Sequence, residues 1–317
     1  MKNSQLKKVL ITDGVHPLLI EGLESAGYVC DHHPKISLEE VRKRIPPYNG
    51  LVINSKITVD RSMLDNAPHL EFVARLGSGM EIVDQIYAAQ KGVAVYSAPE
   101  GNCNAVAEHA LGMLLALANN LVRSDQEVRQ KIWRREANRG FEIMGKTVGI
   151  IGFGHTGSSF AAKLSGMGVN ILAYDKYKKN YAAHLTYVEE TSLKNIIQNA
   201  DIISLHLPLT PETYHFINDE FIQQVAHPFL LINTSRGTCI RTQDLLEGLE
   251  SGKITGACLD VFENEKTESF SENENNLYQS LYVYPQVILS PHVAGWTVES
   301  KERLAAVLLE KITNFHQ

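Results

Sequence analysis

Three residues of the chain have side chains whose combination could act on a carbonyl compound. Arg236, Glu265 and His292 each come shortly after an apolar run that predicts a buried strand, so each is expected near the end of a strand. An arginine can clamp a carboxylate with two parallel hydrogen bonds and polarise a carbonyl, and a histidine can give or take a proton near neutral pH. A carboxylate beside the imidazole favours its protonated form. Together these residues predict a site that binds a carboxylate and moves a proton at a neighbouring oxygen.

A glycine-rich motif in the middle of the chain predicts a dinucleotide beside this site. An apolar run, 148–151, leads into Gly152-Phe153-Gly154-His155-Thr156-Gly157, and an amphipathic segment follows. The first glycine permits a tight turn, the second lets the backbone approach a pyrophosphate, and the third lets a helix pack close to the strand. The helix N-terminus offers N–H groups and a positive dipole end to the phosphates. The predicted contacts are Gly152, Gly154, His155, Thr156 and Gly157.

The next apolar run, 169–174, ends at Asp175, which predicts NAD as the dinucleotide. Its carboxylate can accept hydrogen bonds from both ribose hydroxyls of an adenosine, and its charge would repel the 2′-phosphate of NADP. Lys176, Lys178 and Lys179 follow at once and could soften this preference. A nicotinamide next to the three residues above predicts hydride transfer.

The elements that must position these residues alternate between strands and helices. Strands are predicted at 148–151, 169–174, 202–207, 229–233, 256–262 and 287–290, and helices between them at 193–199, 219–224 and 242–250. This alternation implies a parallel, doubly wound sheet with its ligand site at the carboxyl ends of the strands. The acidic run 263–276 is predicted to be a solvated loop beside that site.

The first hundred residues show a smaller pattern of the same kind. Strands are predicted at 9–11, 51–54, 72–76 and 93–96, and helices at 17–26, 38–44 and 81–90. Gly77-Ser78-Gly79, just before the last of these helices, is either a plain turn or an anion cradle, and Arg75 favours an anionic ligand.

The chain is therefore predicted to be an α/β protein with two domains. A doubly wound parallel-sheet (Rossmann) NAD-binding domain would span 101–295, and a smaller flavodoxin-like α/β substrate domain would comprise 1–100 and 296–317. The closing amphipathic helix, 298–315, is expected to pack back onto the smaller domain.

One helix is more hydrophobic than a monomer's surface allows. The segment 103–125 is apolar on nearly all sides, so we expect it to be buried between domains or against a second subunit. The following segment, 127–143, carries Trp133 and Arg134 in a polar setting that suits an exposed, interface-forming arm.

Composition excludes several classes of protein. Among 317 residues the 36 acidic side chains outnumber the 30 basic ones, which disfavours nucleic acid as a partner. The polar first residues show no signal region, and the longest apolar stretch, 110–118, is too short for a membrane span, so a cytoplasmic protein is expected. The four cysteines show neither CxxC nor metal spacing, which fits a reducing compartment and predicts no metal. The adjacent His32 and His33 are expected on the solvated surface.

These features resemble the D-isomer-specific 2-hydroxyacid dehydrogenases, and within them the phosphoglycerate dehydrogenase-like branch. The resemblance covers essentially the whole chain. It rests on the segments 75–79 (RLGSG), 104–108 (NAVAE), 152–157 (GFGHTG), 206–213 (HLPLTPET), 233–237 (NTSRG), 259–262 (LDVF) and 290–295 (SPHVAG).

The resemblance implies a role for each catalytic candidate. Arg236 would bind the substrate carboxylate and keto oxygen, His292 would exchange the proton, and Glu265 would orient His292. The backbone of Ser78 and Gly79 would bind the substrate carboxylate. The family is typically homodimeric through its nucleotide-binding domains, so a homodimer is expected.

It also implies the residues that hold the cofactor. Asp260 would hold the nicotinamide carboxamide and Asp175 the adenosine ribose. Further cofactor contacts are predicted at His206, Pro208, Thr213 and Thr234.

The chain departs from the family pattern at two places near the site. Lys266 stands where the family usually has a proline after the catalytic glutamate, although Glu265 remains a better candidate than Glu263. Asn54-Ser55-Lys56 stands where phosphoglycerate enzymes commonly carry an arginine. Lys56 and Arg75 could still neutralise a phosphate, lysine as a point charge without arginine's fork. Because the chain stops just after the closing helix, no C-terminal amino-acid-binding regulatory domain is expected.

The expected activity is NAD-dependent interconversion of a D-2-hydroxy acid and its 2-keto acid. The first substrate predicted is 3-phosphoglycerate, which would place the protein in serine biosynthesis. Glycerate with hydroxypyruvate, or a small acid such as D-lactate, is the alternative. A non-catalytic NAD(H)-sensing protein of the corepressor type is the alternative from another class. The sequence leaves open the substrate's side chain, the oligomeric state and the physiological direction.

Overall fold

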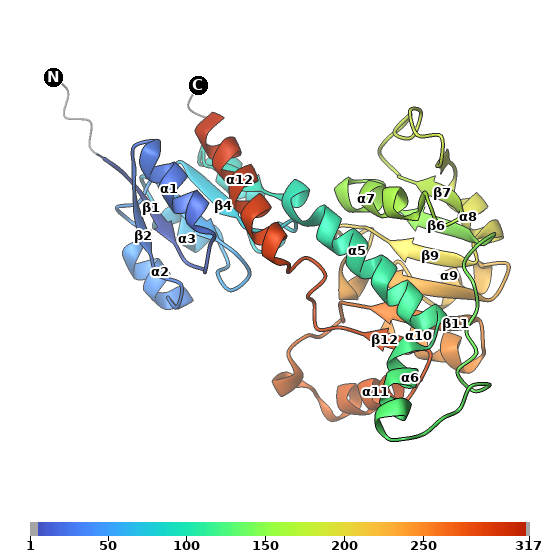
Figure 1. The fold of residues 1–317 in the computed structure, drawn as a ribbon. Coiled ribbons are helices and arrows are strands. Elements are labelled where there is room, and N and C mark those ends of the chain that lie inside the picture. Colours follow the sequence, from blue (N-terminus) through green and yellow to red (C-terminus); the bar gives the residue numbers. More distant parts are fainter. Residues whose placement is uncertain (1–5, 315–317) are drawn as a thin grey trace. The chain divides into compact units, whose positions relative to one another are not determined.

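The structure, a computed structural model, describes residues 6–314 and divides into two compact units. Unit 1 comprises Met1–Cys103 and Trp296–Gln317, and unit 2 comprises Asn104–Gly295. Each unit is built on one parallel sheet with helices on both faces, which confirms the predicted fold class (Figure 1).

Unit 1 has a five-stranded parallel sheet in the order β2-β1-β3-β4-β5, the order of flavodoxin-like folds. The strands are β1 (Lys7–Ile11), β2 (Tyr28–His32), β3 (Gly50–Ile53), β4 (Phe72–Arg75) and β5 (Ala94–Ser97). The helices are α1 (Pro17–Ser25), α2 (Leu38–Arg44), α3 (Arg61–Asp65), α4 (Gln85–Gln90) and α12 (Val298–Asn314). The edge strand β2 and the short helix α3 were absent from the sequence prediction, because neither carries a long enough apolar pattern.

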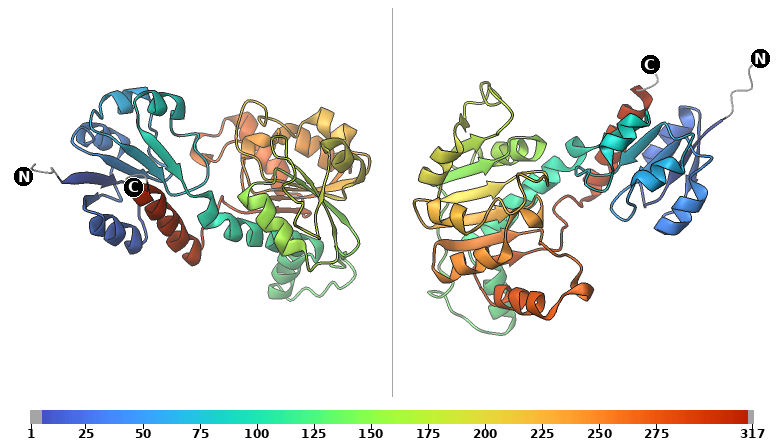
Figure 2. Two further views of the ribbon diagram at one scale, coloured as in Figure 1. Left: turned by 90° about the horizontal axis from the view of Figure 1, so that it is seen from above. Right: turned by 180° about the vertical axis from the view of Figure 1, so that it is seen from behind.

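Two apolar clusters cover the two faces of this sheet. Helices α1 and α12 lie on one face of the sheet, and α2, α3 and α4 lie on the other (Figure 2). Their apolar side chains form the two clusters with the strands. The closing helix α12 thus packs onto unit 1, where a Cβ on Gly22 of α1 would lie 2.1 Å from a methyl group of Leu309.

The glycine loop of unit 1 does not open a helix as predicted. The helix α4 begins at Gln85, with Asp84 as its N-cap, and not at residue 81. Between the loop and α4 the chain forms a parallel bridge from Val83 to Val59. The helix start predicted at residue 81 is therefore wrong, and a helix dipole cannot contribute at 77–79, whereas anion binding by the backbone of this loop stays a prediction.

Unit 2 has a seven-stranded parallel sheet in the order β12-β11-β10-β9-β6-β7-β8. The strands are β6 (Thr147–Ile151), β7 (Asn170–Tyr174), β8 (Glu189–Glu190), β9 (Ile202–Leu205), β10 (Phe229–Asn233), β11 (Ile254–Leu259) and β12 (Val287–Leu289). The helices are α5 (Pro99–Ala118), which begins in unit 1, α6 (Leu121–Arg129), α7 (His155–Leu164), α8 (Leu193–Asn199), α9 (Asp219–Gln224), α10 (Thr242–Glu250) and α11 (Glu272–Tyr282), with 3₁₀ turns η1 (Gly237–Cys239) and η2 (Thr267–Ser269). The strand order reverses at β6, so the ligand crevice is expected at the carboxyl ends of β6 and β9.

The hydrophobic helix predicted at 103–125 is two helices. It breaks at Asn120, whose backbone is left-handed (φ 51°), and α6 starts after the break. Apolar side chains of α5, among them Ala110, Leu114 and Leu117, pack in unit 2's own core against β6 and α7. The prediction that this face needs another domain or subunit for burial is therefore wrong for these residues. Within residues 6–314 no single helix is long and apolar enough to cross a membrane, and only the bent pair α5 and α6 passes by length and composition.

The acidic run 263–276 is mostly exposed, as predicted, but it is not all loop. It contains η2 and the first turn of α11. Ser271 caps α11 and Glu274 bonds back to the Ser271 N–H, a reciprocal capping box. The S-x-x-E spacing that signals this helix start is present in the sequence, but the density of charge around it favoured a loop.

Candidate active site

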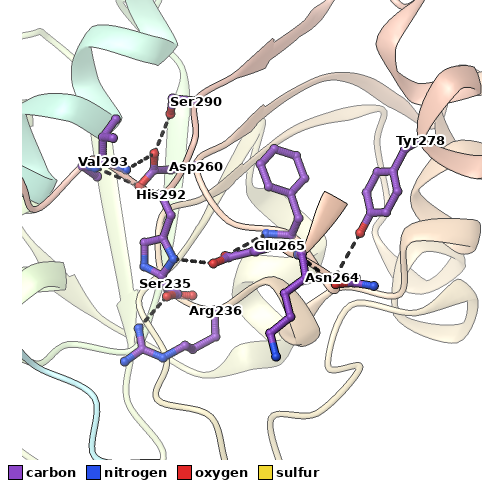
Figure 3. A network of polar contacts seen from close by, with 12 residues as sticks. Ser235, Arg236, Asp260, Asn264, Glu265, Tyr278, Ser290, His292 and Val293 are labelled. Carbon is purple, nitrogen blue, oxygen red and sulfur yellow. Dashed lines mark hydrogen bonds and ion pairs between the residues drawn. The ribbon is translucent and has the colours of Figure 1, made fainter. Parts of the chain in front are cut away.

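Three neighbouring strands of unit 2 bring the predicted catalytic residues together. Arg236 follows β10, Glu265 follows β11 and His292 follows β12, and these strands pair in register at one end of the sheet. His292 Nδ1 lies 2.8 Å from Glu265 Oε2, and Arg236 belongs to the same cluster (Figure 3). Both members of the His–Glu pair are about half exposed, at 49% and 41%. The site therefore sits at the carboxyl ends of parallel strands, as the alternating pattern predicts.

The Glu265 carboxylate is ionised at neutral pH. Burial raises the pKa of Glu265, but the hydrogen bond and charge of His292, the Phe262 N–H and the charge of Arg236 outweigh it and hold that pKa below 4.5. A carboxylate accepts, so His292 Nδ1 carries the hydrogen of this bond. The ring atom left for proton exchange with a substrate is His292 Nε2.

A buried aspartate holds the turn that carries His292. The backbone of His292 is left-handed (φ 56°), which is costly for a residue with a side chain. Its N–H donates to Asp260 O at 2.8 Å, while the Asp260 carboxylate accepts from Ser290 Oγ (2.6 Å), Val293 N (2.9 Å) and Ala294 N (2.9 Å). Asp260 is 1% exposed. Its carboxylate thus fixes the His292 turn, and its contact with a nicotinamide carboxamide stays a prediction.

A second histidine supports this aspartate, and sequence reasoning missed it. His109 Nε2 lies 2.8 Å from Ser290 Oγ and 3.6 Å from Asp260 Oδ1. The only sequence signal is a titratable side chain within the apolar helix α5, which by itself is more often a structural residue.

Arg236 is placed by the loop after β10. Its carbonyl accepts from Asn233 Nδ2 at 2.9 Å, and its Nη1 donates to Ser235 O at 2.7 Å. The next residue must be glycine, because a Cβ on Gly237 would lie 1.9 Å from the carbonyl of Phe262. This close approach joins the Arg236 loop to the segment that leads to Glu265.

The glycine turn after β6 fits a dinucleotide. Gly152 has a positive φ of 91°, and a Cβ there would lie 2.3 Å from His206 O. A Cβ on Gly157 would lie 2.1 Å from Gly152 O. A Cβ on Gly154 would meet nothing within 4 Å, and Gly154 has no side chain to cap α7. The turn is therefore closed where backbones pack together and open at the helix start, where a phosphate can take the place of a cap. His155 and Thr156 form the first turn of α7.

Asp175 is fixed at the end of β7. It accepts from Phe153 N (2.9 Å), Tyr177 N (3.0 Å) and Lys178 N (3.1 Å). Burial raises the pKa of Asp175, but these N–H groups and the Lys178 charge lower it below its usual range, so the carboxylate is ionised.

Two of the three lysines after Asp175 have partners inside unit 2. Lys176 Nζ lies 2.8 Å from Glu212 Oε2, and Lys178 Nζ donates to Phe153 O at 3.0 Å. These contacts reduce the positive charge that the sequence offers to a 2′-phosphate.

The other predicted cofactor residues lie after β9 and β10. Desolvation lowers the pKa of His206 to about 3, so its ring is neutral, and its Nε2 lies 2.9 Å from Ser204 Oγ. Thr213 Oγ1 donates to Pro208 O at 2.6 Å and closes the loop after β9. Within residues 6–314 the buried Thr234 hydroxyl has no hydrogen-bond partner, so it can still bond a ligand.

The predicted substrate residues of unit 1 lie at the ends of β3 and β4. Lys56 Nζ donates to Pro34 O at 2.7 Å and lies 3.9 Å from Asp13 Oδ1. Arg75 Nε donates to Asn54 O at 3.1 Å.

Arg75 also lies 3.5 Å from a carboxylate, that of Glu81. Each of the two cations predicted to neutralise a phosphate therefore has a carboxylate neighbour. In the glycine loop beside them, Ser78 Oγ donates to Asn102 Oδ1 at 2.9 Å, and Gly79 follows.

A second His–Glu pair lies in unit 2, and sequence reasoning did not predict it. His215 Nε2 lies 2.6 Å from Glu263 Oε1, and Glu263 Oε2 accepts from Thr242 N at 2.6 Å. Both side chains are 25% exposed. Glu263, the alternative to Glu265 in the sequence, thus has a different histidine as its partner.

A pocket of about 400 Å³ opens beside the Glu265–His292 pair. Both members of the pair line it, together with aromatic side chains that include Phe262, Phe270 and Tyr282. The pair can therefore exchange protons with solvent. No group of three or more potential metal ligands occurs among the described side chains.

Known proteins are similar to this chain over most of its length. Residues 111–294 match the model of the D-isomer specific 2-hydroxyacid dehydrogenase family, NAD binding domain. A D-3-phosphoglycerate dehydrogenase of Mycobacterium leprae is 35% identical over 269 residues, which cover 84% of this chain and 49% of that protein. A hydroxypyruvate reductase of Thermotoga maritima is 34% identical over 274 residues, which cover 86% and 87%.

A solved structure is similar over nearly its full length. The D-lactate dehydrogenase of Aquifex aeolicus, complexed with NAD and lactic acid, has a TM-score of 0.84 at 27% identity and covers 97% of this chain and 95% of that one. By contrast, this chain spans about half the length of the phosphoglycerate dehydrogenases that it matches.

Proposed function

Because the chain belongs to the D-isomer specific 2-hydroxyacid dehydrogenases, which are NAD-dependent oxidoreductases, we propose that it interconverts a small D-2-hydroxy acid and its 2-keto acid. The catalytic residues are Arg236, Glu265 and His292. The observation that carries this assignment is the 2.8 Å contact between His292 Nδ1 and Glu265, which leaves Nε2 for the substrate. No observation favours the alternative of a non-catalytic NAD(H) sensor.

The three catalytic residues have different roles in the oxidative direction. Arg236 clamps the substrate carboxylate and stabilises the oxygen that becomes a carbonyl. His292 Nε2 takes the hydroxyl proton, and Glu265 balances the charge of the imidazolium that forms. The nicotinamide of bound NAD supplies the hydride acceptor. In the reductive direction His292 returns the proton to the oxygen.

The cofactor is held by unit 2. The turn 152–157 and the start of α7 bind the pyrophosphate, and Asp175 binds the adenosine ribose. His206, Pro208, Thr213 and Thr234 would line the rest of the cofactor site, and Asp260 would hold the nicotinamide carboxamide. The partners of Lys176 and Lys178 support NAD over NADP.

D-3-Phosphoglycerate and 3-phosphohydroxypyruvate are the first substrate pair, which would place the reaction in serine biosynthesis. The support is the name shared by relatives from several organisms, each matched over about half of its length. In this proposal the backbone of Ser78 and Gly79 binds the substrate carboxylate, and Lys56 and Arg75 face the phosphate.

The second candidate is an unphosphorylated pair, glycerate with hydroxypyruvate or D-lactate with pyruvate. A specific observation favours it, because Lys56 and Arg75 each lie near a carboxylate, from Asp13 and Glu81 respectively. The match to 87% of a hydroxypyruvate reductase points the same way.

A homodimer in the cytoplasm completes the proposal. The helix α6 and the segment after it expose several large apolar side chains, which are Leu121, Val122, Val128, Trp133, Phe141 and Met144. Trp133 is 76% exposed, and such a surface suits association. Sedimentation velocity should give a dimer that Trp133→Asp weakens, and a monomer in the unchanged protein would contradict it.

Steady-state NADH oxidation with phosphohydroxypyruvate, hydroxypyruvate and pyruvate tests the function and separates the substrates. A preference for the phosphorylated acid of about 100-fold in kcat/KM, or about 2.7 kcal/mol, would support the first pair. Lys56→Ala and Arg75→Ala should then abolish the preference. A preference for an unphosphorylated acid would support the second pair, and inactivity towards a wider panel of 2-keto acids would overturn the proposed function.

A further inference from the structure

The residue before Glu265, Asn264, is held by hydrogen bonds of its backbone N–H and of both polar atoms of its side chain. Asn264 N donates to Tyr278 Oη at 3.1 Å, and its Nδ2 donates to Glu274 Oε1 at 2.9 Å. Its Oδ1 accepts from Lys266 N at 2.9 Å, so the same side chain spans the position of Glu265 (Figure 3). These contacts define the backbone on both sides of the glutamate.

The two partners of Asn264 on α11, Glu274 and Tyr278, are themselves held by further contacts. Glu274 Oε2 accepts from the Ser271 N–H at 2.8 Å and from its hydroxyl at 2.7 Å, which completes the capping box. Hydrogen bonds from Asn264 and Ser271 lower the pKa of Glu274 to about 2, so its carboxylate is ionised at neutral pH. The Tyr278 ring is 2% exposed and stacks on Phe270 with centroids 4.8 Å apart.

Glu265 itself has few restraints. Within the described chain its carboxylate bonds only to His292 Nδ1 at 2.8 Å and to Phe262 N at 3.4 Å. The second of these is long for a hydrogen bond. The direction of the Glu265 side chain therefore depends on where its backbone is held.

We propose that Glu274 and Tyr278 are positioning residues for the hydride-transfer reaction, because by fixing Asn264 they aim Glu265 at His292. Two residues of α11 thus support the catalytic pair through Asn264 and without a hydrogen bond to either of its members. This inference rests on the proposed function, in which Glu265 orients His292. A small displacement of an orienting group can cost about a hundredfold in rate.

The chain offers a matched control for the test. Glu272 and Glu274 both lie in the first turn of α11, and the Glu272 side chain makes no hydrogen bond or ion pair within residues 6–314. Glu274→Ala should lower kcat by about 5- to 20-fold, with the KM values for NADH and the 2-keto acid within about twofold of the unchanged protein. Glu272→Ala should stay within about twofold in all three constants. Glu274→Gln, which keeps an acceptor at this position, should restore most of kcat.

A double-mutant cycle separates positioning from a general structural effect. In a Glu265→Gln background, Glu274→Ala should cause no further loss of kcat, because its effect passes through Glu265. An equal loss in both backgrounds, or no loss in either, would overturn the inference. Should Glu274→Ala lower the melting temperature too far, Tyr278→Phe removes one hydroxyl, keeps the stacked ring, and should lower kcat by about two- to fivefold. Inactivity of the unchanged protein would refute the proposed function itself, whereas an active protein with an unaffected Glu274→Ala variant would refute only this inference.

Discussion

The glutamates of the two His–Glu pairs in unit 2 lie two residues apart, yet the pairs differ in their exposure and in their access to a pocket. Glu263 and His215 are 2.6 Å apart, and Glu265 and His292 are 2.8 Å apart. Glu263 uses both oxygens, one for His215 and one for Thr242 N, and Tyr214 stacks on His215 at 4.0 Å. The second pair is nearly twice as exposed and lines a pocket of about 400 Å³.

The contrast shows that a His–Glu contact alone does not define an active site. Both oxygens of Glu263 accept hydrogen bonds of 2.6 Å, and this saturated pair fastens the loop after β9 and the start of α10 to the end of β11. The His292–Glu265 pair keeps His292 Nε2 uncommitted to Glu265 and has Arg236 in the same cluster. Access to a pocket and a neighbouring arginine, more than the His–Glu distance, distinguish this open pair, which we propose to react, from the saturated one.

Replacing Arg236 should have the largest effect on the open site. Arg236→Ala should lower kcat/KM for every accepted 2-keto acid by about 10³- to 10⁴-fold, because the carboxylate clamp and the charge on the reacting oxygen are both lost. Arg236→Lys keeps the charge without the fork and should recover part of the activity. Near-normal kcat/KM for Arg236→Ala, measured by NADH oxidation, would remove this residue from the site.

Replacing Glu265, the glutamate of the pair that lines the pocket, should have a smaller effect on activity. Glu265→Gln should lower kcat by about 10- to 100-fold at neutral pH, since Gln can still orient His292 but cannot balance an imidazolium charge. The KM for NADH should change little, because the cofactor turn lies on other strands. A loss in NADH affinity as large as the loss in kcat would contradict the assigned role.

The same Glu→Gln replacement at Glu263, in the saturated pair, should lower stability and leave catalysis nearly unchanged. Glu263→Gln leaves His215 or Thr242 N without a charged acceptor, which costs about 1 to 3 kcal/mol of the free energy of unfolding. Its kcat/KM should stay within about threefold of the unchanged protein. Urea unfolding and NADH oxidation on the same preparation test both, and a Glu263→Gln loss of activity equal to that of Glu265→Gln would erase the distinction between the pairs.

The pH dependence of stability gives the smallest expected difference. The pKa of Glu265 in the folded protein lies below its ordinary value of 4.5, so its contacts add stability above pH 4.5. This contribution is lost as the pH falls through the folded pKa. The melting temperatures of the unchanged protein and of Glu265→Gln should therefore converge as the pH falls from about 6 towards 3. A gap that widens over this range would mean that the sign of the shift is wrong.

The sequence predicted the regular parts of the fold because their patterns are local. The bounds of α8, α9 and α10 match the prediction, and the strand, glycine turn and helix around Gly152 follow from chain geometry alone. The helix expected at 81 begins at Gln85, because a bridge to Val59 occupies the residues before it. Local propensity does not include such a contact.

The residues of the candidate site were likewise predictable only in part. Arg236, Glu265 and His292 were found from their places at strand ends, which a doubly wound sheet must bring together. His109 and His215 were missed because their partners, Ser290 and Glu263, are distant in sequence. A lone histidine carries no signal for such a pairing, and only the folded chain shows it.

The most direct test replaces each histidine by asparagine and compares the two variants in one assay. NADH oxidation is measured with the 2-keto acid that the unchanged protein prefers, and circular dichroism confirms folding. We expect His292→Asn to lose about 10²- to 10⁴-fold in kcat/KM, whereas His215→Asn should stay within about fivefold. Equal losses in the two variants, or an active His292→Asn, would show that the open pair is not the one that reacts.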